Sequence, residues 1–261
     1  MTNIVILTGA GVSAESGLST FRDSDGLWEK YRLEDVASPQ GFARDPASVH
    51  AFYNARRAKA ASVLPNAAHS AIATLQRMRD HSVFLITQNV DSLHEQAGSP
   101  QVLHMHGQLD SALCAACEHR WPASTDMSVN DTCPLCAARA VRPDIVWFGE
   151  IPEFMDEIEV HLGSAELFVA IGTSGQVYPA AGFVAEAARA GAAILVNSRT
   201  PCLAKRPCAT ISLRRSRSHP VALRPDCWRP CWSMIWMARK PSSPKPVSSR
   251  LGMMTMTPAS D

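Results

Sequence analysis

The sequence predicts an α/β protein with a doubly wound parallel sheet, a small helical insert and a module that binds zinc. Three observations predict this fold class: short apolar segments end in polar turns, segments with helical periodicity separate them, and four cysteines form two Cys-x-x-Cys pairs. Of the 261 residues, 46% are hydrophobic and 19% are charged, which is typical of a chain that forms a core.

The predicted strands are short apolar segments spaced along the chain. Residues 3–8, "NIVILT", form the first, and "GAGVSAESG" follows it directly. Residues 81–89 and 165–174 repeat the pattern of an apolar strand that ends in a polar turn. Residues 180–198 predict a helix, a glycine stop and a last strand that ends at Asn197. Strands that alternate with helices predict a parallel sheet.

The polar turns after these strands predict a nucleotide site, because ligands of such sheets bind beyond the carboxyl ends of the strands. The turns are residues 9–15, residues 88–91, residues 172–174 and Asn197. Gly9 and Gly11 would let the backbone approach a phosphate, and the next helix would point its N-terminal amides at it. The third glycine is Gly17, so the spacing is not G-x-G-x-x-G, and this loop alone also fits a plain strand-turn-helix.

The chain has no segment that predicts export or a membrane span. No apolar run reaches the roughly 18 residues of a membrane helix, and "MTNIVILTGAG" does not resemble a secretory signal. We therefore expect a cytoplasmic protein, in which cysteines bind metal or carry chemistry more often than they form disulfides.

Four cysteines have the spacing of a zinc site. Cys114 and Cys117 form one Cys-x-x-Cys pair, Cys133 and Cys136 form the second, and 15 residues separate the pairs. Each pair can turn two thiolates toward one ion, and two pairs complete a tetrahedral site with no open position. A thioredoxin-like redox role needs only one pair and leaves the second unexplained. We therefore predict one structural Zn²⁺ without a catalytic role.

Two histidines, His104 and His106, stand in "LHMHG" after a predicted strand. The residue type alone leaves structural and catalytic roles open, because a general base must lie within reach of the proton that it removes.

Six motifs occur together and in one order. They are "TGAGVSAESGLSTFR" (8–22), "TQNVDSLHEQAG" (87–98), "HMHG" (104–107), the paired Cys-x-x-Cys, "RPDIVWFGE" (142–150) and "GTSGQVYPAA" (172–181). The combination resembles the sirtuins, which are NAD-dependent protein deacylases, and is most similar to their bacterial members. The resemblance spans residues 3–197. It implies a Rossmann-like NAD-binding domain (1–44, 64–110 and 142–197), a small helical insert (45–63) and a zinc module (111–141).

The resemblance also implies roles for individual residues. NAD would be bound by Gly9, Ala10, Gly11, Ser13, Glu15, Phe21, Arg22, Trp28, Gln88, Asn89, Val90, Asp91, Gly172, Thr173, Ser174 and Asn197. His106 would be the general base on the ribose hydroxyls, with Asn89 and Asp91 as further catalytic residues. The reaction would yield nicotinamide, free lysine and O-acyl-ADP-ribose. Val146 and Phe148 would help to add an acylated-lysine peptide as a strand.

Residues 45–63 have helical periodicity and place Tyr53 and Arg56 on one helix face. Alone, this pattern also fits a surface helix with an ordinary arginine. In a sirtuin it resembles the subclass that removes succinyl and malonyl groups. A dicarboxylic acyl chain brings a carboxylate, which a fixed guanidinium and a phenol can bind. We therefore expect desuccinylase and demalonylase activity beside deacetylase activity.

Residues 198–261 differ sharply in charge from the rest of the chain. They carry 12 Lys/Arg against Asp226 and Asp261, whereas residues 1–197 carry 13 basic and 22 acidic residues. Where sirtuins usually have Asn-Leu-Glu or similar at the end of this strand, this chain has Asn197-Ser198-Arg199. If each codon starts one base earlier, Ser198 becomes leucine and the two Cys-Trp pairs become apolar residues with helical spacing. We therefore favour a frameshift and expect an aberrant, disordered basic tail.

Two other interpretations of this tail remain open. A second zinc site of Cys202, Cys208, Cys227 and Cys231 fits no usual spacing, whereas a basic arm with stacking tryptophans would bind nucleic acid. The alternative functions are a catalytically impaired zinc- and nucleotide-binding protein with such an arm, and a protein mono-ADP-ribosyltransferase. We expect acylated lysine side chains of proteins as partners, rather than membranes or nucleic acid.

Overall fold

The computed structural model describes residues 1–18 and 31–197. Phe21, Arg22 and Trp28, which are expected to contact NAD, and the expected aberrant tail of residues 198–261 lie outside the described residues. Within the described ranges, no helix is long and apolar enough to cross a membrane.

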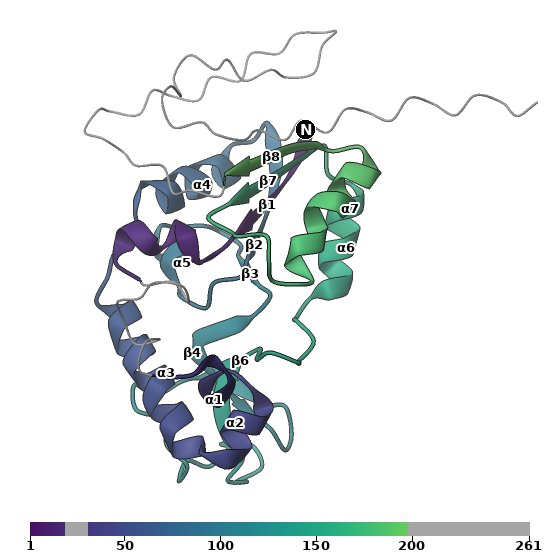
Figure 1. Ribbon diagram of the computed structural model, residues 1–261. Coiled ribbons are helices and arrows are strands. Elements are labelled where there is room, and N and C mark those ends of the chain that lie inside the picture. Colours follow the sequence, from purple (N-terminus) through teal and green to yellow (C-terminus); the bar gives the residue numbers. More distant parts are fainter. Residues whose placement is uncertain (19–30, 198–261) are drawn as a thin grey trace, which may run out of the picture. The chain divides into compact units, whose positions relative to one another are not determined.

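A five-stranded parallel sheet forms the centre of the described fold (Figure 1). Its strands, in spatial order, are β3 (Leu103–His104), β2 (His81–Thr87), β1 (Thr2–Thr8), β7 (Leu167–Ile171) and β8 (Ala193–Asn197). The parallel sheet predicted from the apolar segments is therefore confirmed. The central strand β1 is an almost continuous apolar run because helices cover both of its faces.

The helices lie on both faces of this sheet and beyond its edge (Figure 1). They are α1 (Leu33–Val36), α2 (Pro39–Arg44), α3 (Pro46–Ala61), α4 (Ala67–Arg77), α5 (Leu93–Gln96), α6 (Met155–Gly163) and α7 (Phe183–Ala190), with short 3-10 helices at Ala10–Val12, Ala14–Ser16 and Ala180–Gly182. Successive side chains of β1 point to opposite faces. Val5 packs in one cluster with Phe183 of α7, and Ile4 packs in another with Ile72 of α4. The sheet therefore has a hydrophobic core on each face.

Capping side chains explain where two of the helices begin. Asp45 accepts a hydrogen bond from the Ser48 amide at 3.0 Å and precedes Pro46, so α3 starts there. Asn66 caps α4, and the His69 ring accepts from the Asn66 amide at 3.2 Å in return. This capping box also places the His69 ring beside the sheet edge that the turns occupy.

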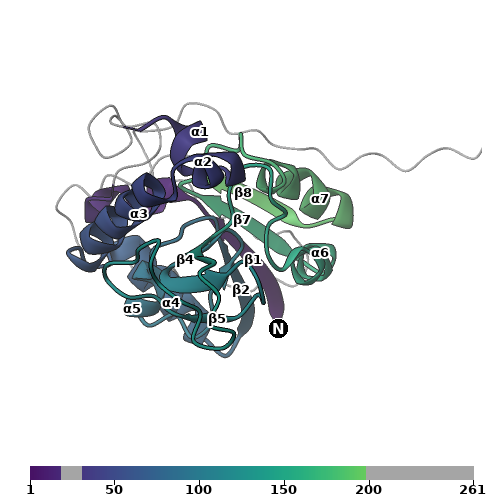
Figure 2. The ribbon, with the colours of Figure 1, turned by 90° about the horizontal axis from the view of Figure 1, so that it is seen from below.

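A second, antiparallel sheet contains β5 (Arg120–Pro122), β4 (Gly107–Cys114) and β6 (Val141–Ile145) in that spatial order. Figure 2 views the fold from the side on which β4, β5 and α3 are seen. A hydrophobic cluster joins this sheet to α3, and its members include Val36, Phe52, Tyr53, Leu109, Ile145 and Trp147. The helix that carries Tyr53 is therefore held by β4 and by the end of β6.

The helix expected directly after the first strand is not formed. Two single-turn 3-10 helices follow β1, and Gly17 ends the second with a φ of 91°. A left-handed residue cannot continue a right-handed helix, so the chain turns away after one turn. Within the described residues, the helix expected after the first strand is therefore replaced by two single-turn 3-10 helices.

Candidate active site

The turns after β1 and β7 touch each other through their backbones. The Gly9 amide donates to the Ile171 carbonyl at 3.1 Å, and the Gly11 amide donates to the Gly172 carbonyl at 2.8 Å. A Cβ on Gly11 would lie 2.7 Å from the Gly172 oxygen, and one on Gly172 would lie 2.3 Å from the Val12 nitrogen. Neither position can hold a side chain unless the two turns separate.

The turns after β2 and β8 join the same edge of the sheet. The side-chain Nε2 of Gln88 donates to the Thr173 hydroxyl at 2.9 Å, and the backbone amide of Gly172 donates to the Asn197 carbonyl at 2.9 Å. Glu15 and Ser174 are exposed at this edge. We call the turns 9–15, 88–91 and 172–174, together with Asn197, the nucleotide edge. The structure brings all four together, as the sequence predicts.

A buried polar network lies under the nucleotide edge. The side-chain Nδ2 of Asn89 donates to the Ser13 hydroxyl at 3.0 Å, and that hydroxyl donates to the Asp91 carboxylate at 3.1 Å. Burial raises the pKa of the Asp91 carboxyl, although hydrogen bonds from Leu93 and Ser13 oppose the shift. Within the described residues, Asn89 Oδ1 is buried and has no hydrogen-bond partner. An acceptor of this kind is costly unless a ligand donates to it, so the network fits a nucleotide with hydroxyl or amide groups.

His106 lies beside this network with one ring nitrogen held. His106 Nδ1 is 3.2 Å from the Gln88 carbonyl oxygen, which can only accept, so in the neutral ring Nδ1 carries the proton and Nε2 keeps its lone pair. Burial lowers the pKa of the His106 imidazole, while the bond to Gln88 opposes that shift. The ring is therefore neutral at pH 7 and can accept a proton at Nε2.

His104 differs from His106 because acceptors face both of its nitrogens. Nδ1 lies 3.0 Å from the Asn89 carbonyl, and Nε2 lies 2.7 Å from the Glu95 carboxylate. The ring therefore ties the Asn89 backbone to α5 and has a structural position.

Two further buried histidines were missed from the sequence. His69 Nε2 lies 3.4 Å from the Ser13 hydroxyl, and His94 Nε2 lies 3.1 Å from the Thr8 hydroxyl. Burial lowers the pKa of His69 to about 4 and that of His94 to about 3. Both rings are therefore neutral partners of the network. His69 had one sequence signal, the Asn-x-x-His capping pattern, but nothing in the sequence relates it to Ser13.

Tyr53 and Arg56 lie on α3, next to the hydrophobic cluster. The Tyr53 side chain is buried and accepts a hydrogen bond from the Trp147 indole at 3.0 Å. Burial raises the pKa of the Tyr53 phenol to about 12. The Arg56 guanidinium carbon lies 5.9 Å from the centre of the Phe52 ring. Burial lowers the pKa of Arg56, whereas attraction to Tyr53 and Asp91 opposes the shift. We call Tyr53, Arg56 and Trp147 the acyl region.

Val146, Trp147 and Phe148 follow β6, outside any strand. The Val146 amide donates to the His106 carbonyl at 3.0 Å, and the Phe148 amide donates to the Ala37 carbonyl at 3.0 Å. Because these two amides already have partners, a peptide that lies along this segment must form its hydrogen bonds with backbone groups other than the Val146 and Phe148 amides. Half of the Phe148 side chain is exposed beside it.

The four cysteines form one cluster in the antiparallel module. Their sulfur atoms all lie within 4.8 Å of one another, with Cys114 and Cys136 at 3.6 Å and Cys117 and Cys133 at 3.7 Å. Four thiolates around one tetrahedral zinc ion, with Zn–S of about 2.3 Å, lie about 3.8 Å apart. The cluster therefore fits structural Zn²⁺, and all four thiolates would be used by the metal.

The fold and the site together define a Rossmann-like nucleotide-binding protein with a four-cysteine metal module. Residues 9–179 match the Sir2 family, and the chain belongs to that family. It is 58% identical to an NAD-dependent protein deacylase of Caulobacter vibrioides over 194 residues, which is 73% of this chain and 82% of that protein. It is 53% identical to an NAD-dependent protein deacylase of Escherichia coli strain K12 over 192 residues, which is 72% of this chain and 69% of that protein.

Solved structures give the same assignment. A Sir2 homologue in complex with NAD superposes with a TM-score of 0.68 at 41% identity, covering 76% of this chain and 79% of that one. A Sir2 protein bound to a myristoylated histone peptide superposes with a TM-score of 0.56 at 33% identity, covering 74% of this chain and 77% of that one.

Proposed function

We propose that this protein is an NAD-dependent protein-lysine deacylase whose acyl region accepts succinyl and malonyl groups as well as acetyl groups. Membership of the Sir2 family and the names of the deacylase relatives support the NAD-dependent reaction. The observation that supports the wider acyl range is that Tyr53 and Arg56 lie three residues apart on α3, with the Arg56 guanidinium carbon 5.9 Å from the centre of the Phe52 ring.

The nucleotide edge supplies the residues that would hold NAD. The glycine turn at 9–11 would lie along the phosphates. Gly172, Thr173, Ser174 and Asn197 would lie beside the adenosine half, and Gln88, Asn89 and Asp91 beside the nicotinamide and its ribose. Phe21, Arg22 and Trp28 belong to the same proposed set. The unpartnered Asn89 Oδ1 is a position where a ligand donor gains a hydrogen bond without displacing a protein partner. When bound, NAD would supply the ribose that takes the acyl group on a hydroxyl oxygen, with nicotinamide as the leaving group.

His106 would act as the general base on a ribose hydroxyl. The Gln88 carbonyl fixes the Nδ1–H tautomer, so the proton is taken at Nε2. His104 holds the Asn89 backbone behind it at 3.0 Å, and the Ser13 hydroxyl joins Asn89 to Asp91. These bonds keep the base and the ribose side of the site in one arrangement.

Arg56 and Tyr53 would bind the carboxylate at the end of a succinyl or malonyl chain. A guanidinium and a phenol that remains protonated both donate to a carboxylate. An acetyl group ends before this pair and needs neither residue. Tyr53 and Arg56 would therefore distinguish dicarboxylic acyl groups from acetyl, whereas His106 would act as the base for every acyl group.

A direct assay tests this proposal. Acetyl-, succinyl- and malonyl-lysine versions of one peptide are incubated with the full chain, with and without NAD, and products are identified by mass spectrometry. We expect free lysine from all three peptides, one nicotinamide for each lysine, and no turnover without NAD. His106→Ala serves as the control for contaminating activity. Turnover of the acetyl peptide alone would refute the acyl range, and no turnover with NAD would refute the deacylase assignment for this chain.

A further inference from the structure

Trp147 links the segment after β6 to α3, the helix that carries Tyr53 and Arg56. Its side chain is 3% exposed, and its indole N–H donates to the Tyr53 oxygen at 3.0 Å. An indole nitrogen can only donate, so the Tyr53 oxygen must be the acceptor in this bond. The two residues are 94 positions apart in the sequence, and no motif joins them.

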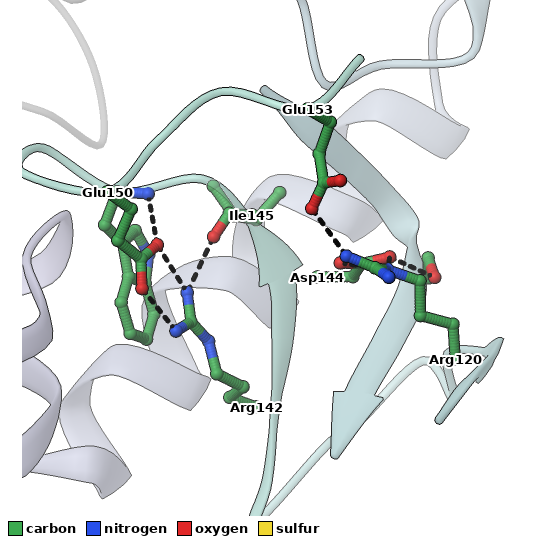
Figure 3. Close-up of polar contacts among 8 residues, drawn as sticks. Arg120, Arg142, Asp144, Ile145, Glu150 and Glu153 are labelled. Atoms are coloured by element: carbon green, nitrogen blue, oxygen red, sulfur yellow. Dashed lines mark hydrogen bonds and ion pairs between the residues drawn. The ribbon is translucent and has the colours of Figure 1, made fainter. Parts of the chain in front are cut away.

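The orientation of the Trp147 ring is held from several sides. The Arg142 guanidinium lies over the ring, with 3.5 Å from its central carbon to the ring centre, and Phe42 packs at 5.1 Å between ring centres. Arg142 donates to both oxygens of Glu150 at 2.6 and 3.0 Å (Figure 3). Glu150 in turn accepts from the Trp147 amide at 2.8 Å. The ion pair thus fixes both the backbone and the ring of Trp147.

The bond from Trp147 determines what Tyr53 can offer a ligand. A phenol proton prefers the plane of its ring and therefore has two positions, one on each side of the oxygen. Since the Trp147 N–H occupies one side, the Tyr53 proton is turned to the other. Burial raises the pKa of Tyr53 to about 12, so that proton is retained at neutral pH. Toward a ligand, Tyr53 is then a donor and complements an acceptor such as a carboxylate.

We propose that Trp147 is a positioning residue for acyl selectivity, which directs the Tyr53 hydroxyl toward the carboxylate of a dicarboxylic acyl group. This inference rests on the proposed function, because it assigns the cause of a preference that the proposed function requires. Trp147 acts through Tyr53 and does not itself contact the substrate. The Arg142–Glu150 pair supports the same arrangement by holding the indole in place.

The variant Trp147→Phe tests the inference, because it keeps an aromatic ring against Arg142 and Phe42 and removes only the N–H donor. The ratio of kcat/KM for the succinyl peptide to kcat/KM for the acetyl peptide should fall by about 3- to 10-fold, the usual effect of one neutral hydrogen bond. The change should be mainly in KM for the succinyl peptide. A purely structural loss would lower both activities together and leave the ratio unchanged.

A double-mutant cycle with Tyr53→Phe isolates the route of the effect. If Trp147 acts through the Tyr53 hydroxyl, adding Trp147→Phe to Tyr53→Phe leaves the ratio of the single Tyr53 variant unchanged. A further fall of the ratio in the double variant would overturn the inference. Should Trp147→Phe fail to fold, 3-benzothienylalanine at position 147 keeps the bicyclic shape and replaces the N–H by sulfur.

The outcomes separate this inference from the proposed function. If the unchanged protein does not turn over the succinyl peptide, the proposed acyl range and the proposed role of Trp147 are both refuted. If Tyr53→Phe lowers the ratio and Trp147→Phe does not, the proposed function stands and the role of Trp147 is wrong. If both lower it and the cycle shows no added effect, the inference holds.

Discussion

The nucleotide edge and the acyl region are built from different interactions. At the nucleotide edge, backbone groups of neighbouring turns bond to each other, and Asn89, Ser13 and Asp91 form a buried chain of hydrogen bonds. In the acyl region, aromatic packing surrounds one phenol and one guanidinium, and the Trp147 indole donates a hydrogen bond to Tyr53. The nucleotide edge fits a ligand that is the same in every reaction. In the acyl region, a change of one or two side chains can alter which acyl group is bound.

This contrast predicts which variants change the rate with every acyl substrate and which change the preference among acyl groups. A change at the nucleotide edge should affect every acyl substrate in the same proportion, because all of them share NAD. A change in the acyl region should alter the preference among acyl groups. The zinc module should affect stability and leave the preference unchanged.

The largest effect is expected for His106→Ala. Loss of a general base costs about 10²- to 10⁴-fold in rate, and the acetyl and succinyl reactions should fall by the same factor. Steady-state kinetics with both peptides measures this, and calorimetric titration with NAD shows whether the fold and the cofactor site are retained. Unequal losses for the two peptides would break the contrast between the two regions.

The second-largest effect is expected when one of the four metal-binding cysteines is replaced, and it is a loss of thermal stability. Cys117 is exposed, and without a metal Cys117→Ser should change the unfolding free energy by less than about 0.5 kcal/mol. With structural zinc, the same change should lower the melting temperature by several degrees and the zinc content below one ion per chain. Thermal unfolding and elemental analysis provide the two readouts. A melting temperature equal to that of the unchanged protein would argue against a metal that supports the fold.

The smallest effect is expected in the pH dependence. Burial holds the pKa of His106 below its usual 6.5, and the base must be neutral to act. Activity should therefore persist below pH 6.5 and fall only as the pH drops through the lowered pKa. The acid limb of kcat/KM should be the same for acetyl and succinyl peptides, because it reports His106, which every acyl substrate would use, and not the acyl region. An acid limb above pH 6.5 would count against His106 as the base.

The parallel sheet could be predicted because β1 and β2 each contain a run of four apolar residues and end in polar turns. The antiparallel sheet could not, since β4 mixes Asp110 and Ser111 with apolar residues and its pairing with β6 depends on distant contacts. The contact between Trp147 and Tyr53 could not be predicted either, because it joins residues 94 positions apart in the sequence. The cysteine cluster was predictable because its spacing is local.

The frameshift interpretation of residues 198–261 stays a prediction, because that segment lies outside the described residues. Resequencing the gene across the codons of Asn197 and Ser198 tests it directly. A read that restores Asn-Leu and the apolar helical pattern supports it, and an unchanged frame removes it.

The most direct test of the account compares Arg56→Met with the unchanged protein on acetyl and succinyl peptides. A charge-assisted hydrogen bond contributes about 1.5–3 kcal/mol, or roughly 10- to 100-fold. We predict a loss of that size in kcat/KM for the succinyl peptide and a much smaller loss for the acetyl peptide. Equal losses for both peptides would contradict the assignment of Arg56 to the acyl carboxylate.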